Sequence, residues 1–230
     1  MVAPEAREAH RRSVRAGLTL RLWLEREKLS AFSMNFQAAG RPDGLPVMPF
    51  LEVGLAMARG IGYAGEGDVL TAGLMGAVAS IIPETTFTEM FCPDWRGGRI
   101  FLSHMGEWNI DLAVGRPRLV EYEFVFGRAQ NPVRPVGCLQ AGAAVLANLA
   151  PLANEQFRLI LSPGCMEAPR GRDNLADSVH GWFRPRLPLN DFLADYSRRG
   201  GTHHSILVYG EQGDLLAWFG AGMGWEVVNL

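Results

Sequence analysis

The segment TTFTEMFCPDWRGGRIFLSH, residues 85–104, contains two short runs of strand-forming residues separated by proline and glycine. The runs cover 85–91 and 99–104, and comparable ones follow at 119–126, 143–149 and 156–162. Short strands with turn residues between them are typical of an antiparallel sheet or barrel. We therefore predict that residues 83–230 form a mostly antiparallel, β-barrel-like domain. Short helices are expected at 190–198 and 214–219 and strands at 204–209 and 226–230.

Before Pro83, the pattern is one of alternating helices and strands. Residues 4–29 are predicted to form a helix packed on a sheet through an apolar face made of Val14, Leu18, Leu22 and Trp23. A strand is expected at 31–36 and helices at 49–59 and 69–82, the last capped by Asp68. Residues 1–82 thus resemble the closing part of an α/β domain. The predicted fold class is α/β followed by mostly antiparallel β, with the two parts packed together.

The composition limits the classes of function. The chain has 230 residues, 48% of them hydrophobic, and a net charge of −2. Its apolar stretches fall short of the ~20 residues of a membrane span and no secretory signal is visible, so we expect a cytoplasmic protein without a membrane segment. The charge argues against nucleic-acid binding. Three cysteines without CxxC spacing argue against a disulfide framework, and a single lysine, Lys28, argues against Schiff-base chemistry.

Two segments place side chains that suit a ligand at the ends of predicted elements. His203 and His204 follow a glycine turn in GGTHHSILVYG and begin a predicted strand. Such a pair, taken alone, packs or hydrogen-bonds more often than it binds metal. Glu66 lies between two glycines in GYAGEGD, where the backbone can approach a ligand closely. Capping of the following helix is the alternative role for Glu66.

Residues 85–104 contribute two further candidates. Glu89 lies in a strand-like apolar run, where a carboxylate must be paired, bound to metal or turned to water. His104 ends the second run. Two carboxylates and two imidazoles together form a mixed oxygen and nitrogen set, which suits manganese(II), cobalt(II) or magnesium. We therefore predict a divalent metal site.

Four motifs, GYAGEGD, TTFTEMF, LSHMGEW and GGTHHS, occur in the order of the metal-site motifs of L-arabinose isomerases. The segment SMNF is similar to a substrate-lining segment that precedes them in that family. The chain therefore resembles the carboxy-terminal part of an L-arabinose isomerase, in the wider L-fucose and L-arabinose isomerase superfamily. The resemblance implies one divalent metal, Mn²⁺ first, with Co²⁺ or Mg²⁺ as alternatives. The implied ligands are Glu66, Glu89, His104 and His204.

The resemblance also implies a reaction. Glu66 and Glu89 match the family's acid/base pair, which interconverts an aldose and a ketose through an enediol. Phe36 and Met105 match residues that line the sugar site, and His203 is implied as a neighbour of the substrate, not as a first-choice metal ligand. The implied substrate is a small sugar, a pentose or a deoxyhexose.

Members of the family are longer than this chain and assemble as oligomers. The resemblance therefore implies a homo-oligomer, together with an amino-terminal half that is either separately encoded or lost. Residues after His104 match the family less well. A non-catalytic sugar-binding or regulatory module that retains the metal pocket is the alternative function. His180, in the divergent tail, is expected to be structural.

Overall fold

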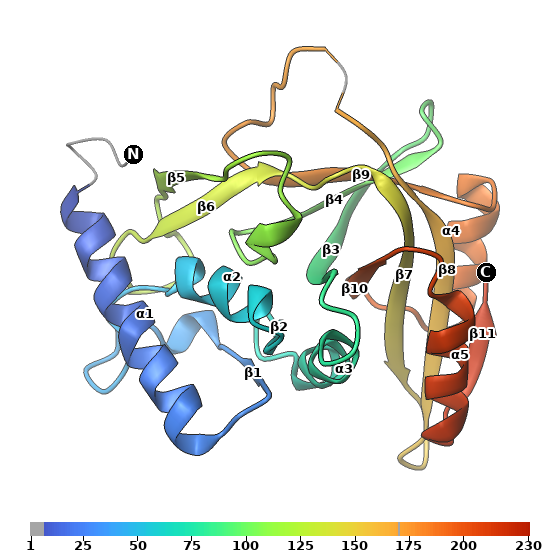
Figure 1. Cartoon of the computed structure of the whole chain (residues 1–230), viewed down its shortest axis with the longest axis horizontal. Helices are drawn as coiled ribbons and strands as arrows, with labels where there is room; N and C mark the ends of the chain where they lie inside the picture. Colours follow the sequence, from blue (N-terminus) through green and yellow to red (C-terminus); the bar gives the residue numbers. More distant parts are fainter. Residues whose placement is uncertain (1–6, 170) are drawn as a thin grey trace.

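The computed structural model describes residues 7–169 and 171–230. Figure 1 shows the first two helices and a small two-stranded sheet on one side of the molecule, with the large sheet beside them and the last helices at the far edge. The helices are α1 (Arg7–Glu27), α2 (Phe50–Ala58), α3 (Val69–Ala79), α4 (Leu189–Arg198) and α5 (Gly213–Gly222), with 3₁₀ turns η2 (Phe36–Ala38) and η3 (Ile110–Leu112). No helix in the described ranges is long and apolar enough to cross a bilayer.

The strands of the described residues form two sheets. β1 (Ala31–Ser33) pairs in parallel with β2 (Gly62–Ala64). The large sheet has the order β11-β8-β7-β10-β3-β4-β9-β6-β5. Its strands are β3 (Thr85–Asp94), β4 (Arg99–His104), β5 (Arg118–Glu121), β6 (Val133–Cys138), β7 (Gly142–Pro151), β8 (Phe157–Met166), β9 (Val179–Pro185), β10 (His204–Tyr209) and β11 (Glu226–Asn229).

Most neighbours in the large sheet are antiparallel, and the parallel pairs are β11 with β8 and β6 with β9. The end of β8 also pairs with β9, at Gly164 to Pro185 and the two following positions. The predicted class, α/β followed by mostly antiparallel β, is confirmed in this mixed α/β form. The barrel-like shape is not confirmed by this strand order. The division into residues 1–82 and 83–230 stays a prediction.

Both faces of the large sheet are covered by apolar side chains. Along β10, Ile206 and Val208 join the cluster that contains α3, whereas Leu207 joins the cluster that contains α4. This explains why the segment ILV, residues 206–208, is apolar without interruption, since a strand buried on both faces lacks the polar alternation of a half-exposed one. β10 is therefore a rigid base for the histidine at its start.

The prediction of which residues form the buried apolar face of the first helix was wrong. Leu18 and Leu22 are exposed, and α1 instead buries small residues together with Leu20 and Leu24. Gly17 explains the difference, because a Cβ there would lie 2.8 Å from Cβ of Glu52 in α2. Close contact between the two helices requires small side chains, so the larger residues face away.

Two predicted strands are shorter in the structure. The strand expected at 31–36 ends at Ser33, because the side chain of Asn35 accepts a hydrogen bond from the backbone N–H of Gln37 and starts η2. The strand expected at 119–126 ends at Glu121, and the ring of Phe124 packs beside Phe36. Both changes place aromatic rings in one cluster next to the end of β4.

Candidate metal centre

His204 begins β10 and stands opposite Glu89 of β3 in the antiparallel register. Its Nδ1 lies 3.0 Å from Oδ2 of Asp68. A carboxylate only accepts hydrogen bonds, so Nδ1 carries the proton. Nε2 of His204 is buried without a hydrogen-bond partner among the described residues and lies 3.9 Å from Oε2 of Glu66. The lone pair of Nε2 is therefore free for a ligand.

His104 ends β4 and is fixed in the same way. Its Nδ1 lies 2.6 Å from Oε2 of Glu107, a fully buried carboxylate that also accepts a hydrogen bond from the hydroxyl of Tyr63 at 3.0 Å. Burial lowers the pKa of His104, but Glu107 and the charges of Glu89 and Glu66 outweigh burial and raise the pKa. Glu66 and Glu89 therefore act on His104 electrostatically. Because Glu107 occupies Nδ1, Nε2 is the ring nitrogen of His104 left for a ligand.

The two imidazoles face a common aromatic wall. The ring of Phe87 lies 4.8 Å from that of His104 and 5.0 Å from that of His204, measured between centroids. The two histidine rings are 5.6 Å apart. Phe87 is buried, so it holds both rings in place and excludes water from one side of the site.

Glu66 reaches the site from a strained turn between β2 and α3. Its φ is +60°, a left-handed conformation that costs an ordinary side chain free energy. Gly65 before it admits no side chain, because a Cβ would lie 2.8 Å from Cε1 of His104. About half of the Glu66 side chain is exposed. The turn therefore presents a carboxylate beside two fixed imidazoles.

Asp68 serves both the turn and the site. Its Oδ1 accepts the backbone N–H of Thr71 at 2.9 Å and so caps α3, as predicted, while Oδ2 orients His204. Partial burial raises the pKa of Asp68, but the hydrogen bonds from His204 and Thr71 outweigh it and lower the pKa to about 2. Asp68 is thus ionised at neutral pH.

The predicted ligands are not all equally close in the structure. Among the described residues, one group of possible ligands lies within 4.8 Å of one another, and it consists of Glu66, His203 and His204. Glu89 is near this group, with Oε1 4.0 Å from Nε2 of His203. The assignment of Glu66, Glu89, His104 and His204 to one ion therefore stays a prediction. The carboxylates and imidazoles nevertheless meet where β10 begins and β4 ends, on the central strands of the large sheet.

The residues predicted to line a sugar site lie next to His104. The ring of Phe36 is buried, 6.2 Å from that of His104. Met105 is held at both ends, because Tyr122 donates to its sulfur at 3.5 Å and Arg134 donates to its carbonyl at 2.7 Å. The guanidinium of Arg134 also stacks over the Tyr122 ring at 3.8 Å.

Sequence reasoning missed two residues that orient the candidate ligands, Glu107 and Tyr63. Glu107 stands three residues after His104 in LSHMGEW, and this spacing was its visible signal. Tyr63 gave none, since its hydroxyl reaches Glu107 only through the packing of β2. His180 is buried in its own environment, with Nε2 3.3 Å from Asp173, as expected for a structural residue.

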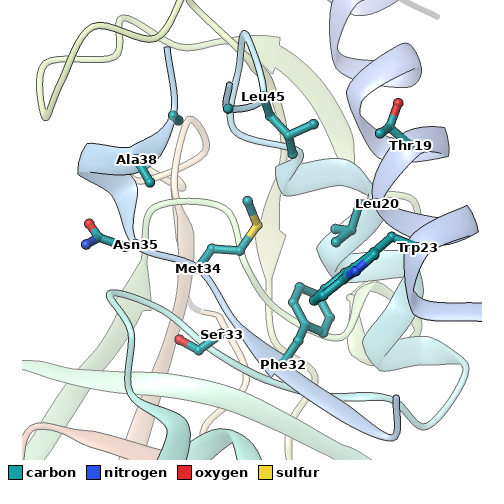
Figure 2. A pocket seen from close by; sticks show the side chains of 11 residues that line it. Thr19, Leu20, Trp23, Phe32, Ser33, Met34, Asn35, Ala38 and Leu45 are labelled. Atoms are coloured by element: carbon teal, nitrogen blue, oxygen red, sulfur yellow. The ribbon is translucent and has the colours of Figure 1, made fainter. Parts of the chain in front are cut away.

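Two cavities differ in chemistry. One, of about 450 Å³, is lined by Glu66, Asp68, Thr202, His203 and His204 together with apolar side chains. The other, of about 320 Å³, is apolar, and Figure 2 shows Leu20 and Trp23 of α1 facing Phe32 and Met34 across it. No candidate ligand lines the apolar cavity. The polar cavity is therefore the candidate site for a small hydrophilic ligand.

Two family models match consecutive parts of the chain. The family model for the L-arabinose isomerase central domain matches residues 3–83, and that for the L-arabinose isomerase C-terminal domain matches residues 84–226. The chain belongs to the L-arabinose isomerase family. Of the four candidate ligands, Glu66 lies in the region matched to the central domain and Glu89, His104 and His204 in that matched to the C-terminal domain.

Curated relatives in the L-arabinose isomerase family match almost the whole chain. An L-arabinose isomerase of Nocardioides sp. is 35% identical over 210 residues, covering 88% of this chain and 41% of the relative. The L-arabinose isomerase of Clostridium beijerinckii is 30% identical over 218 residues, covering 90% of this chain and 43% of the relative. The L-arabinose isomerase of Anoxybacillus flavithermus is 29% identical over 226 residues, covering 96% of this chain and 44% of the relative. The chain thus spans less than half the length of these relatives.

Proposed function

We propose that this chain carries the metal-binding and acid/base groups of an aldose–ketose isomerase that acts on a small sugar, with L-arabinose as the first candidate. The observation that carries the proposal is the buried Nε2 of His204, which has no hydrogen-bond partner in residues 7–169 and 171–230 and faces Glu66. An unpaired buried nitrogen costs about 1–3 kcal/mol, so such an atom is expected where a ligand completes its bonding.

The donor set fits a divalent cation. Glu66, Glu89, His104 and His204 would hold it, and two oxygen and two nitrogen donors suit Mn²⁺, with Co²⁺ or Mg²⁺ as alternatives. Glu107 and Asp68 each occupy Nδ1 of one imidazole, so Nε2 is the nitrogen of each ring that a cation can reach. When bound, such a cation polarises the sugar oxygens and stabilises negative charge that develops on them.

The two carboxylates supply the proton transfers. Moving a proton between C1 and C2 of an aldose through an enediol requires a base at the carbon and an acid at the oxygen. Glu66 and Glu89 are proposed for these roles. Phe36 and Met105 are proposed to shape one side of the sugar site, and His203 to lie near the sugar on the other. Phe87 keeps water from the rear of the imidazoles.

The proposal is tested with Glu66→Gln, which keeps the size of the side chain and removes its charge. We expect Mn²⁺ affinity and turnover of L-arabinose to fall while the far-ultraviolet circular dichroism spectrum is unchanged. The matched control is Glu155→Gln, because Glu155 also has a left-handed φ, +58°, but does not line the polar cavity. Equal metal binding and turnover in the parent and in both variants would refute the role of Glu66.

A metal titration combined with the isomerisation assay also separates catalysis from binding alone. An enzyme binds Mn²⁺ and converts the sugar, whereas a sugar-binding or regulatory module binds both without conversion. Because the relatives are more than twice as long as the matched region, the assay includes the chain alone and the chain mixed with a separately expressed amino-terminal part of a relative.

A further inference from the structure

The two adjacent histidines lie side by side, which neighbouring strand residues do not normally do. Successive side chains of a strand point to opposite faces. The rings of His203 and His204 are nevertheless 4.3 Å apart, with 44° between their planes. β10 begins only at His204, and His203 belongs to the turn that follows Gly200, whose φ is +83°. The carbonyl of His203 accepts the N–H of Met90 at 2.9 Å, so the backbone is fixed while the ring is presented to solvent.

Glu66, His203 and His204 form a set of three possible ligands by themselves. One ligand atom from each lies within 4.8 Å of the other two. His204 is the rigid member, because it is buried and Asp68 fixes its tautomer. The polar cavity of about 450 Å³ opens beside the three side chains and leaves room for water or a sugar oxygen to complete the coordination. Two imidazoles with one carboxylate suit manganese(II), iron(II), cobalt(II) and zinc(II).

We infer that these three residues form an outer cation position, distinct from the inner position of the proposed function. The inner position uses Glu89 and His104 and lacks His203. Nε2 of His204 has a single lone pair, so a given chain holds a cation in one position at a time. The inner position is part of the proposed function, and the inference rests on that function only there. The outer position is inferred from the distances among Glu66, His203 and His204 themselves.

The exposure of the ligands gives the order of binding. The side chains of Glu66 and His203 are 49% and 59% exposed, whereas that of His104 is 2% exposed. A hydrated cation therefore meets the outer set first. Glu89, 4.0 Å from His203, is the next carboxylate on the way inward. The outer position is thus a loading site through which the cation reaches the inner ligands.

The experiment compares Co²⁺ titrations, followed by visible absorption, of the parent, His203→Ala, His104→Asn and the double variant. His104→Asn keeps a donor for the buried Glu107, and His10→Ala on α1 is the control for removing a partly exposed histidine outside the site. We expect His104→Asn to bind one Co²⁺ per chain and the double variant to bind it at least about tenfold more weakly than His104→Asn. Equal affinity in His104→Asn and the double variant would overturn the outer position.

The same Co²⁺ titrations distinguish the inner from the outer position. If His203→Ala binds Co²⁺ like the parent while His104→Asn binds none, the inner position stands and the outer one is wrong. If His104→Asn binds like the parent and only His203→Ala loses affinity, the outer position stands and the proposed inner site is wrong.

A stopped-flow measurement keeps the test independent of the buried substitution. His203→Ala should slow Co²⁺ association by about tenfold relative to the parent and to His10→Ala, because its outer position has lost one of three ligands. An unchanged association rate in His203→Ala would overturn the loading role even if His104→Asn failed to fold.

Discussion

Asp68→Asn is the most selective perturbation of the candidate site. The two oxygens of Asp68 each accept one hydrogen bond, from the backbone N–H of Thr71 at 2.9 Å and from Nδ1 of His204 at 3.0 Å. An asparagine offers one oxygen and one NH₂ group, so it satisfies only one of these donors. The N–H of Thr71 is obligatory, because it belongs to the first turn of α3. The NH₂ group is therefore expected to face His204.

That orientation reverses the tautomer of His204. Nδ1 must then accept the hydrogen bond from NH₂, and the proton moves to Nε2, the nitrogen proposed to bind metal. Loss of a residue that orients a ligand costs about 10–100-fold in metal affinity, or about 1.4–2.7 kcal/mol. The stability of the metal-free protein should change by less than about 1 kcal/mol, because asparagine caps a helix as well as aspartate does.

The assay is Mn²⁺ titration by calorimetry, with urea unfolding of the metal-free protein in parallel. Asp173→Asn is the matched control, since it makes the same substitution in the Asp173–His180 pair, whose residues do not line the polar cavity. Asp68→Asn should lose affinity and the control should not. Mn²⁺ affinity within about twofold of the parent in Asp68→Asn would refute the tautomer argument.

Three further predictions concern stability. Phe87→Ala should lower the free energy of unfolding by about 3–5 kcal/mol in urea, because the buried ring supports both histidines; a loss below about 1 kcal/mol would contradict that packing. Burial raises the pKa of Glu167, but hydrogen bonds from Arg99 and Arg184 outweigh it and lower the pKa below its ordinary 4.5. The stabilisation that ionised Glu167 gives the folded protein is therefore present above pH 4.5 and is lost as pH falls through the lowered pKa. Glu167→Gln should lower the free energy of unfolding by about 1–3 kcal/mol at pH 7 and should flatten the acidic part of the stability–pH curve. An unchanged acidic part of that curve would exclude a stabilising role for these two hydrogen bonds. Arg134→Lys should cost about 1–2 kcal/mol in the same urea assay, through lost stacking on Tyr122 and a weaker bond to the carbonyl of Met105; parent-like stability would show that the stacked geometry is dispensable.

Local patterns predicted much of the fold. The strand expected at 204–209 coincides with β10, and the helix expected at 190–198 differs from α4 by one residue. Periodicity identifies such elements because their side chains alternate between faces or repeat with the helical turn. The buried side of α1 was beyond this reasoning, because it depends on close contact of Gly17 with Glu52 of a later helix.

The candidate site shows the same limit. Residue type and position at the ends of predicted elements made Glu66, Glu89, His104 and the His203–His204 pair candidates, and the resemblance to L-arabinose isomerases selected Glu66, Glu89, His104 and His204 from them. The groups that orient them depend on contacts between distant segments, as for Asp68 and His204, which are 136 positions apart. A helix cap was the local role of Asp68 that sequence could predict, and its second oxygen acquires a role only when β10 lies next to α3.

The most direct test of the account is the anomalous X-ray diffraction of crystals soaked in Mn²⁺. The account predicts one anomalous peak within about 2.0–2.4 Å of donor atoms from Glu66, Glu89, His104 and His204. No peak between these four side chains, or a peak held by Glu66, His203 and His204 alone at saturating Mn²⁺, would contradict it.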